Sequence, residues 1–112
     1  MEFRSYREFW PFYVLQHSKL ATRLWHAVGT SFVFLLLILT GFTGKWWLLL
    51  LIPVIAYGLA WFSHFFIEGN KPATFGHPVW SLRGDFHMYF LTISGQMGAE
   101  VERVKKLYAE KK

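Results

Sequence analysis

The sequence of 112 residues contains no cysteine. This absence excludes disulfide scaffolds, iron–sulfur clusters, thiolate zinc sites and cysteine nucleophiles. Charged residues are also scarce, at 17%, where a soluble domain usually carries about 25%. Hydrophobic residues make up 54% of the chain, and its mean hydropathy is +0.26. The length suits a single domain, residues 1–112, and the composition leaves that domain short of side chains that face water.

The few charges are placed unevenly along the chain. Between residues 27 and 67 the only formal charge is Lys45. A single helix of that length would run about 60 Å, roughly twice the hydrocarbon core of a bilayer. A break is therefore expected, and residues 40–45 (Thr-Gly-Phe-Thr-Gly-Lys) supply it. We predict an integral membrane protein with a transmembrane hairpin, its helices at about 22–43 and 46–67. The alternative, a soluble two-helix core, would need more polar surface than this chain offers.

The basic residues predict the orientation of the hairpin. Of the 12 Lys and Arg residues, only Lys45 lies at the turn. The positive-inside rule therefore places both termini in the cytoplasm. The basic residues form no dense patch, so we expect contact with membrane lipid and no nucleic-acid partner.

Helices are also predicted on both sides of the hairpin. Residues 6–16 carry aromatic side chains at helical spacing after Ser5, as in a short interfacial helix. Gly69 and Pro72 should stop the second long helix. A last helix begins at about residue 79 or 81, in one or two pieces, and is amphipathic from Glu100 onwards. No segment alternates as a strand does, so the predicted fold is an all-α helical bundle.

Three of the five histidines are predicted to converge. His17 and His26 lie near the start of the first span, and His64 lies near the end of the second, so the hairpin brings them to one membrane depth. Neutral imidazole is the commonest protein ligand for Fe, Zn and Cu. His17 and His26 fall on opposite faces of one continuous helix, so sharing a metal requires the chain to turn between them. The alternative is that all three are interfacial polar groups.

Two more histidines and one acidic residue are candidates for the same site. His77 and His87 fit better as ordinary loop and helix residues than as ligands. Glu68 lies four residues after His64 and shares its helical face. It is therefore expected either to bind the metal or to orient an imidazole by accepting its second N–H.

The pattern H-x8-H-x2-G followed by H-x3-E-x3-P-A is formed by His17, His26, Gly29, then His64, Glu68, Pro72 and Ala73. It resembles the membrane family of the fungal endoplasmic-reticulum 2-hydroxy fatty acid dioxygenases, which act in phytosphingosine breakdown. The stretches at residues 72–75 and 81–86 resemble the short bacterial branch. The resemblance implies Fe(II)-dependent α-oxidation, in which a 2-hydroxy fatty acid and O2 give the acid one carbon shorter. It also implies His17, His26 and His64 as iron ligands, with Glu68 as a fourth ligand or a supporting group.

Further expectations follow from this resemblance. The membrane would be the bacterial inner membrane, or the endoplasmic reticulum in a eukaryote. The acyl chain would lie along the apolar hairpin. Lys71 or Arg83 would pair with the substrate carboxylate, the alternative being that each is a solvated basic residue. Asp85 would cap a helix that begins near Phe86, in preference to bonding an imidazole.

Two functions of other classes remain open at this point. One is a haem-binding membrane protein that uses two of the histidines as axial ligands. The other is a non-catalytic membrane protein that binds lipid or a partner helix. The glycine spacing does not reach the G-x-x-x-G pattern, so no dimer is predicted and the oligomeric state stays open.

Overall fold

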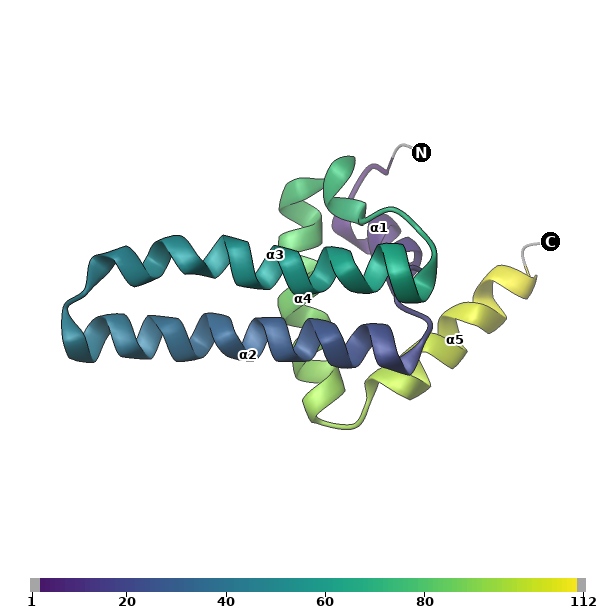
Figure 1. Cartoon of the computed structure of the whole chain (residues 1–112). Helices are drawn as coiled ribbons and strands as arrows, with labels where there is room; N and C mark the ends of the chain where they lie inside the picture. The colour runs from purple at the N-terminus through teal and green to yellow at the C-terminus, as the bar shows by residue number, and fades with distance from the viewer. Residues whose placement is uncertain (1–2, 111–112) are drawn as a thin grey trace.

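The computed structural model describes residues 3–110, and these residues form helices and connecting turns without any strand. Helices α2 (Leu20–Thr43) and α3 (Leu51–Ser63) run antiparallel as a long hairpin (Figure 1). Helix α4 (Pro78–Ile93) crosses the hairpin. Helices α1 (Tyr6–Leu15) and α5 (Met97–Glu110) lie at the end of the hairpin opposite its turn. The predicted all-α bundle is confirmed.

The hairpin turns where the sequence predicts. Helix α2 ends at Thr43, and Gly44 follows in the left-handed conformation with φ +70°. The chain resumes as a 3₁₀ turn, η1 (Trp46–Leu50), which leads into α3. The two continuous helical segments, Leu20–Thr43 and Trp46–Glu68, are long and apolar enough to cross a membrane. The predicted spans, at about 22–43 and 46–67, are therefore confirmed in their length and apolar character.

Most of the hairpin's apolar side chains are exposed. Only 22% of the most apolar window of the first segment and 11% of that of the second are buried inside the protein. A core helix of a soluble protein would bury its apolar face, which these segments do not. The exposed large side chains of α2 and η1 include Leu24, Val28, Phe32, Leu35, Ile38, Phe42, Trp46 and Trp47.

The buried core lies among α1, α4 and α5, towards the end of the hairpin opposite its turn. Ser5 accepts a hydrogen bond from the Glu8 N–H and begins α1, as the sequence predicts. The buried apolar face of α1 packs against Met88 of α4 and against three residues of α5. The core residues are Phe9, Trp10, Tyr13, Val14, Ala73, Met88, Met97, Val101 and Val104. This packing fixes the end of α1, and with it the position of the residues that follow.

The C-terminal region forms two helices. Helix α4 begins at Pro78, and Gly95 in the left-handed conformation separates it from α5. Asp85 therefore lies in the middle of α4, and the expectation that it caps a helix beginning near Phe86 is wrong. The physical reason is that Pro78 occupies the first turn, where its missing N–H costs no hydrogen bond and its fixed φ suits a helix start.

Candidate metal site

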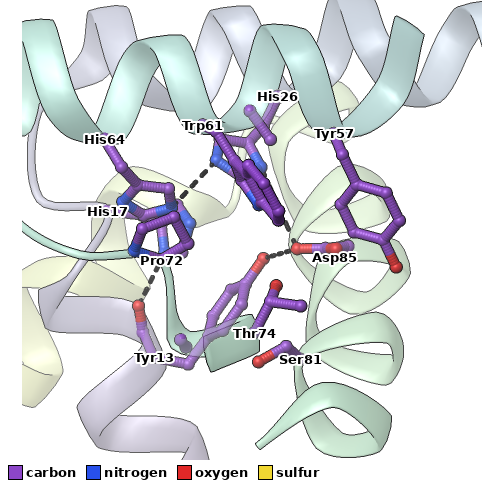
Figure 2. Close-up of a pocket in the computed structure, with 12 residues that line it drawn as sticks. Tyr13, His17, His26, Tyr57, Trp61, His64, Pro72, Thr74, Ser81 and Asp85 are labelled. Atoms are coloured by element: carbon purple, nitrogen blue, oxygen red, sulfur yellow. Dashed lines mark hydrogen bonds and ion pairs between the residues drawn. The ribbon is translucent and has the colours of Figure 1, made fainter. Parts of the chain in front are cut away.

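Three buried imidazoles meet between the base of the hairpin and the end of α1 (Figure 2). His17 follows α1, His26 lies in the second turn of α2, and His64 begins the π-helical turn η2 (His64–Glu68). Their exposed fractions are 1%, 6% and 2%. One ring nitrogen from each lies within 4.8 Å of the others. The convergence that the sequence predicts is therefore present.

The chain turns sharply between His17 and His26, as their shared site requires. Helix α1 ends at Leu15, and α2 begins at Leu20. The guanidinium of Arg23 donates to the carbonyls of His17 at 2.9 Å and Ser18 at 2.8 Å. The carbonyls left free by the break thus receive a charged donor, which stabilises the turn.

Two of the imidazoles are held through Nδ1. The Nδ1 of His17 lies 2.7 Å from the carbonyl of Tyr13, and that of His64 lies 2.7 Å from the amide oxygen of Asn70. Both partners are oxygen acceptors, so Nδ1 carries the proton and Nε2 keeps its lone pair. Burial lowers the pKa of His17 well below its ordinary 6.5. A neutral imidazole with a free Nε2 is the form that binds a metal.

The Nε2 atoms are arranged as metal ligands would be. Nε2 of His26 lies 3.2 Å from Nε2 of His64, and Nε2 of His17 is buried without a hydrogen-bond partner. Metal–imidazole bonds of about 2.0–2.1 Å, at tetrahedral to octahedral angles, separate neighbouring nitrogens by about 2.8–3.4 Å. The separation of the His26 and His64 nitrogens fits two ligands of one ion, and the orphaned Nε2 of His17 is available as the third. The three ring nitrogens lie within 4.8 Å of one another, so binding of an ion would draw the widest pair closer together.

Asn70 is a residue of the site that the sequence reasoning missed. The N–H groups of Gly69 and Asn70 both donate to the His64 carbonyl, at 2.8 and 2.9 Å, and so close the turn back onto His64. Gly69 has φ +79°, which glycine adopts without steric cost. The Asn70 amide nitrogen donates to the Gln16 carbonyl at 3.1 Å, which fixes the direction of its oxygen. The sequence did contain one indication of this role, since Asn70 directly follows Gly69, the glycine that ends the second long helix.

Asp85 and Tyr13 support the opposite side of the site. The Tyr13 hydroxyl donates to Asp85, and the Tyr13 ring stacks on His17 with centroids 4.2 Å apart. The Asp85 carboxylate lies 3.9 Å from Nδ1 of His26, which is longer than a hydrogen bond. Burial raises the pKa of Asp85 to about 7, and the Tyr13 hydrogen bond opposes that rise. Burial also raises the pKa of Tyr13, which therefore stays protonated as the donor.

A glycine makes room for this arrangement. A Cβ at Gly84 would lie 3.0–3.3 Å from three atoms of the Tyr13 ring. The close approach of α4 to α1 at this point brings the Tyr13 hydroxyl to Asp85, and it holds the ring that stacks on His17.

Glu68 lies beside the chain break between α1 and α2. Its carboxylate accepts hydrogen bonds from the Lys19 N–H and from the Ser18 hydroxyl, the latter at 3.2 Å. A carboxylate is favourable at a helix N-terminus, and here it satisfies the first turn of α2. Nδ1 of His64 donates to the amide oxygen of Asn70 instead of to Glu68.

The two basic residues expected to bind a carboxylate lie elsewhere. The guanidinium of Arg83 sits 4.0 Å over the Tyr6 ring and lines a separate surface pocket of about 660 Å³. Lys71 is exposed at the edge of another hollow, beside Phe12 and Phe75.

His77 and His87 lie outside the histidine cluster, as the sequence reasoning favoured. His87 stacks on Trp10 with centroids 3.8 Å apart and bonds the Tyr6 hydroxyl at 3.0 Å. His77 precedes α4 and stacks on Trp80. Both therefore serve in packing.

A small pocket of about 10 Å³ adjoins the three histidines. Its walls come from α3, from the segment at residues 72–74 and from α4. In addition to the histidines, the lining residues are Tyr13, Tyr57, Ala60, Trp61, Pro72, Ala73, Thr74, Ser81 and Asp85. This volume is about the space that a single water or ion occupies.

The sequence was also compared with known proteins. Residues 3–97, which include all three histidines, match the model of a protein family described as 2-hydroxy-palmitic acid dioxygenase Mpo1-like. No curated protein and no solved structure matches the chain.

Proposed function

Because the chain belongs to the 2-hydroxy-palmitic acid dioxygenase Mpo1-like family, we propose that it is an Fe(II)-dependent dioxygenase of 2-hydroxy fatty acids. The proposed reaction is α-oxidation, which yields the fatty acid one carbon shorter. With CO2 and water as the other products, the substrate loses four electrons and O2 accepts them. No reducing co-substrate is then needed.

The convergence of three neutral imidazoles carries this proposal. His17, His26 and His64 would hold the ion and leave its remaining positions open to substrate and O2. Imidazole donors suit Fe, Zn, Cu and Ni alike, so the choice of iron rests on the reaction, because O2 chemistry needs a redox-active metal. Bound Fe(II) would supply the electron exchange with O2 that organic side chains lack.

The chain's own residues would orient and shield this centre. Asn70 and the Tyr13 carbonyl hold two imidazoles in the tautomer that ligates. The Tyr13 hydroxyl keeps the Asp85 carboxylate in place behind His26. Burial of all three rings excludes bulk water from the ligand atoms.

The hairpin supports a membrane location for the enzyme. Its exposed apolar surface suits contact with acyl chains of lipid and of the substrate. In the proposed arrangement the hairpin crosses the membrane, both termini lie in the cytoplasm and the metal site lies at that boundary. Glu68 would act there through the turn that carries His17, and Lys71 and Arg83 would meet anionic headgroups.

The arrangement of the histidines weighs against a haem protein. Three imidazoles converge at one place, whereas a haem iron takes its protein ligands at its two axial positions. The non-catalytic alternative predicts no stoichiometric metal.

Metal content tests the proposal directly. We expect near-stoichiometric iron in detergent-purified protein after anaerobic Fe(II) loading, measured by elemental mass spectrometry. The His64→Ala variant should lose it, and the His87→Ala variant should keep it. The loaded wild type should consume O2 and convert 2-hydroxypalmitate to the C15 acid. Equal iron in wild type and His64→Ala would refute the ligand assignment, and bound iron without turnover would refute the reaction.

A further inference from the structure

Two hydrogen-bond donors in the histidine pocket have no partner. The Ser81 hydroxyl and the Trp61 indole N–H are buried and make no hydrogen bond. They lie on facing walls of the pocket, Ser81 on α4 and Trp61 on α3. The proposed metal ion would satisfy the third orphaned atom of this pocket, Nε2 of His17. Buried donors in native proteins are nearly always satisfied, so these two call for a ligand.

Two buried hydroxyls in the same helical setting are satisfied locally, whereas those of Thr22 and Thr92, which lie outside the pocket, also lack a partner. Thr40 and Ser63 each donate to a carbonyl three or four residues earlier, at 2.7 and 2.6 Å. Ser81 has the same opportunity within α4 and is 2% exposed, yet its hydroxyl bonds to nothing. The side chain lies against the pocket instead (Figure 2).

The charges around the pocket define what the donors would bind. Asp85 is the one carboxylate in its lining, and the lining contains neither lysine nor arginine. Lys71 and Arg83 line other surfaces. An anionic head group at the metal would therefore depend on neutral donors for any oxygen that does not face the metal.

We infer that Ser81 and Trp61 form the subsite for the substrate's carboxylate, a conclusion that rests on the proposed function. A carboxylate accepts hydrogen bonds and donates none, and the indole N–H is a donor only. The substrate's 2-hydroxyl needs no such pair of donors. Because the pocket holds only about 10 Å³, binding of the head group requires the pocket to widen.

The inference has a consequence for the protein without substrate. An orphaned buried hydroxyl costs stability, and its removal relieves that cost. Ser81→Ala should therefore leave the Tm of the ligand-free protein unchanged or raise it. A serine with a structural role would behave in the opposite way. Ser63→Ala, a buried serine whose hydroxyl is already bonded, should lower the Tm and serves as the matched control.

Equilibrium binding of radiolabelled 2-hydroxypalmitate tests the inference without turnover, on Zn(II)-loaded protein in nanodiscs. Ser81→Ala and Trp61→Phe should each weaken the acid's affinity by about tenfold or more, because each removes a hydrogen bond to a charged group. Ser81→Thr, which retains the hydroxyl, should restore most of the affinity. Hexadecane-1,2-diol keeps the 2-hydroxyl and lacks the carboxylate, so its affinity should be the same in all variants.

The outcomes separate this inference from the proposed function. If the wild type binds and converts the acid while Ser81→Ala and Trp61→Phe bind it equally well, the subsite is refuted and the function stands. If the variants lose as much affinity for hexadecane-1,2-diol as for 2-hydroxypalmitate, the donors do not recognise the carboxylate, and the inference also fails. A wild type that binds no 2-hydroxypalmitate refutes both.

Discussion

The three imidazoles of the site differ in what holds their second nitrogen. A backbone carbonyl holds His17, the amide of Asn70 holds His64, and a carboxylate 3.9 Å away stands behind His26. A backbone carbonyl cannot be removed by substitution. The Asn70 amide is therefore the point at which the orientation of a ligand can be tested.

Asn70→Ala should weaken metal binding by about 10- to 100-fold, the usual effect of losing a hydrogen bond to a ligating histidine. The variant loses the acceptor for His64 and the bond to the Gln16 carbonyl. Chelator competition under anaerobic conditions gives the affinity. Asn70→Asp, which keeps an oxygen near Nδ1, should lose less. Equal Fe(II) affinity in Asn70→Ala and wild type would contradict the role of this residue.

Gly84→Ala should disturb the stack of Tyr13 on His17. The added methyl would lie 3.0 Å from the Tyr13 ring, and overpacking of this kind costs about 1–3 kcal/mol. The Tm of thermal unfolding and the metal content of the purified variant should both be lower than in the wild type. Gly98→Ala in α5 is the control, because a Cβ there meets nothing within 4 Å. If the two variants behave alike, α4 and α1 do not approach as closely as described.

At the scale of elements, α5 is attached to α1 by buried apolar contacts and by hydrogen bonds of one half-buried carboxylate. Val101 and Val104 pack into the core, and the Glu100 carboxylate accepts from the Trp10 indole at 2.7 Å and from Arg103 at 2.6 and 3.1 Å. The Arg103 hydrogen bond, opposed by burial and helped by Trp10, holds the pKa of Glu100 below its ordinary 4.5. The carboxylate thus joins two helices that are far apart in the sequence.

Acid should loosen α5 from α1. A carboxyl group whose pKa is lowered by folding stabilises the protein above its ordinary value, and this contribution disappears as the pH falls through the lowered value. Glu100→Gln should therefore raise hydrogen exchange in α5 by about five- to tenfold at neutral pH. Exchange rates of the variant and the wild type are compared at the same pH. Their ratio should approach one as the pH is lowered.

The control for this experiment is Glu102→Gln. Glu102 is exposed and forms only a 3.8 Å surface pair with Lys105. Exposed pairs contribute little, so this variant should exchange as the wild type does. If the ratio of α5 exchange rates between Glu100→Gln and wild type stays constant across pH, the Glu100 carboxylate does not stabilise the contact of α5 with α1.

For the whole molecule, the proposed membrane arrangement places the hairpin turn on one side and both termini on the other. Single cysteines can test it cleanly, because the chain contains none of its own. Lys45→Cys at the turn should react with a membrane-impermeant maleimide from the side opposite to Arg4→Cys and Lys106→Cys. All three positions are exposed. Labelling of all three from one side would contradict a hairpin that crosses the membrane.

Much of this molecule is already readable in its sequence. The hairpin follows from 41 residues with one charge, since transfer into lipid depends on the local composition of each segment. The meeting of His17, His26 and His64 follows as well, because a hairpin returns the chain to the depth at which it started. The sequence also predicts a last helix, in one or two pieces, and the structure has two helices after residue 77.

The partners of the histidines, by contrast, depend on the folded arrangement. Asn70 meets His64 through a π-helical turn closed at Gly69, and Tyr13 meets Asp85 through the approach of α4 to α1. The orphaned hydroxyl of Ser81 is equally invisible in the sequence, because any serine in a helix can bond to its own backbone. Hydropathy and charge act along the chain and can be read from it. A hydrogen bond between distant residues depends on distances of a few ångströms that only the packing of the helices sets.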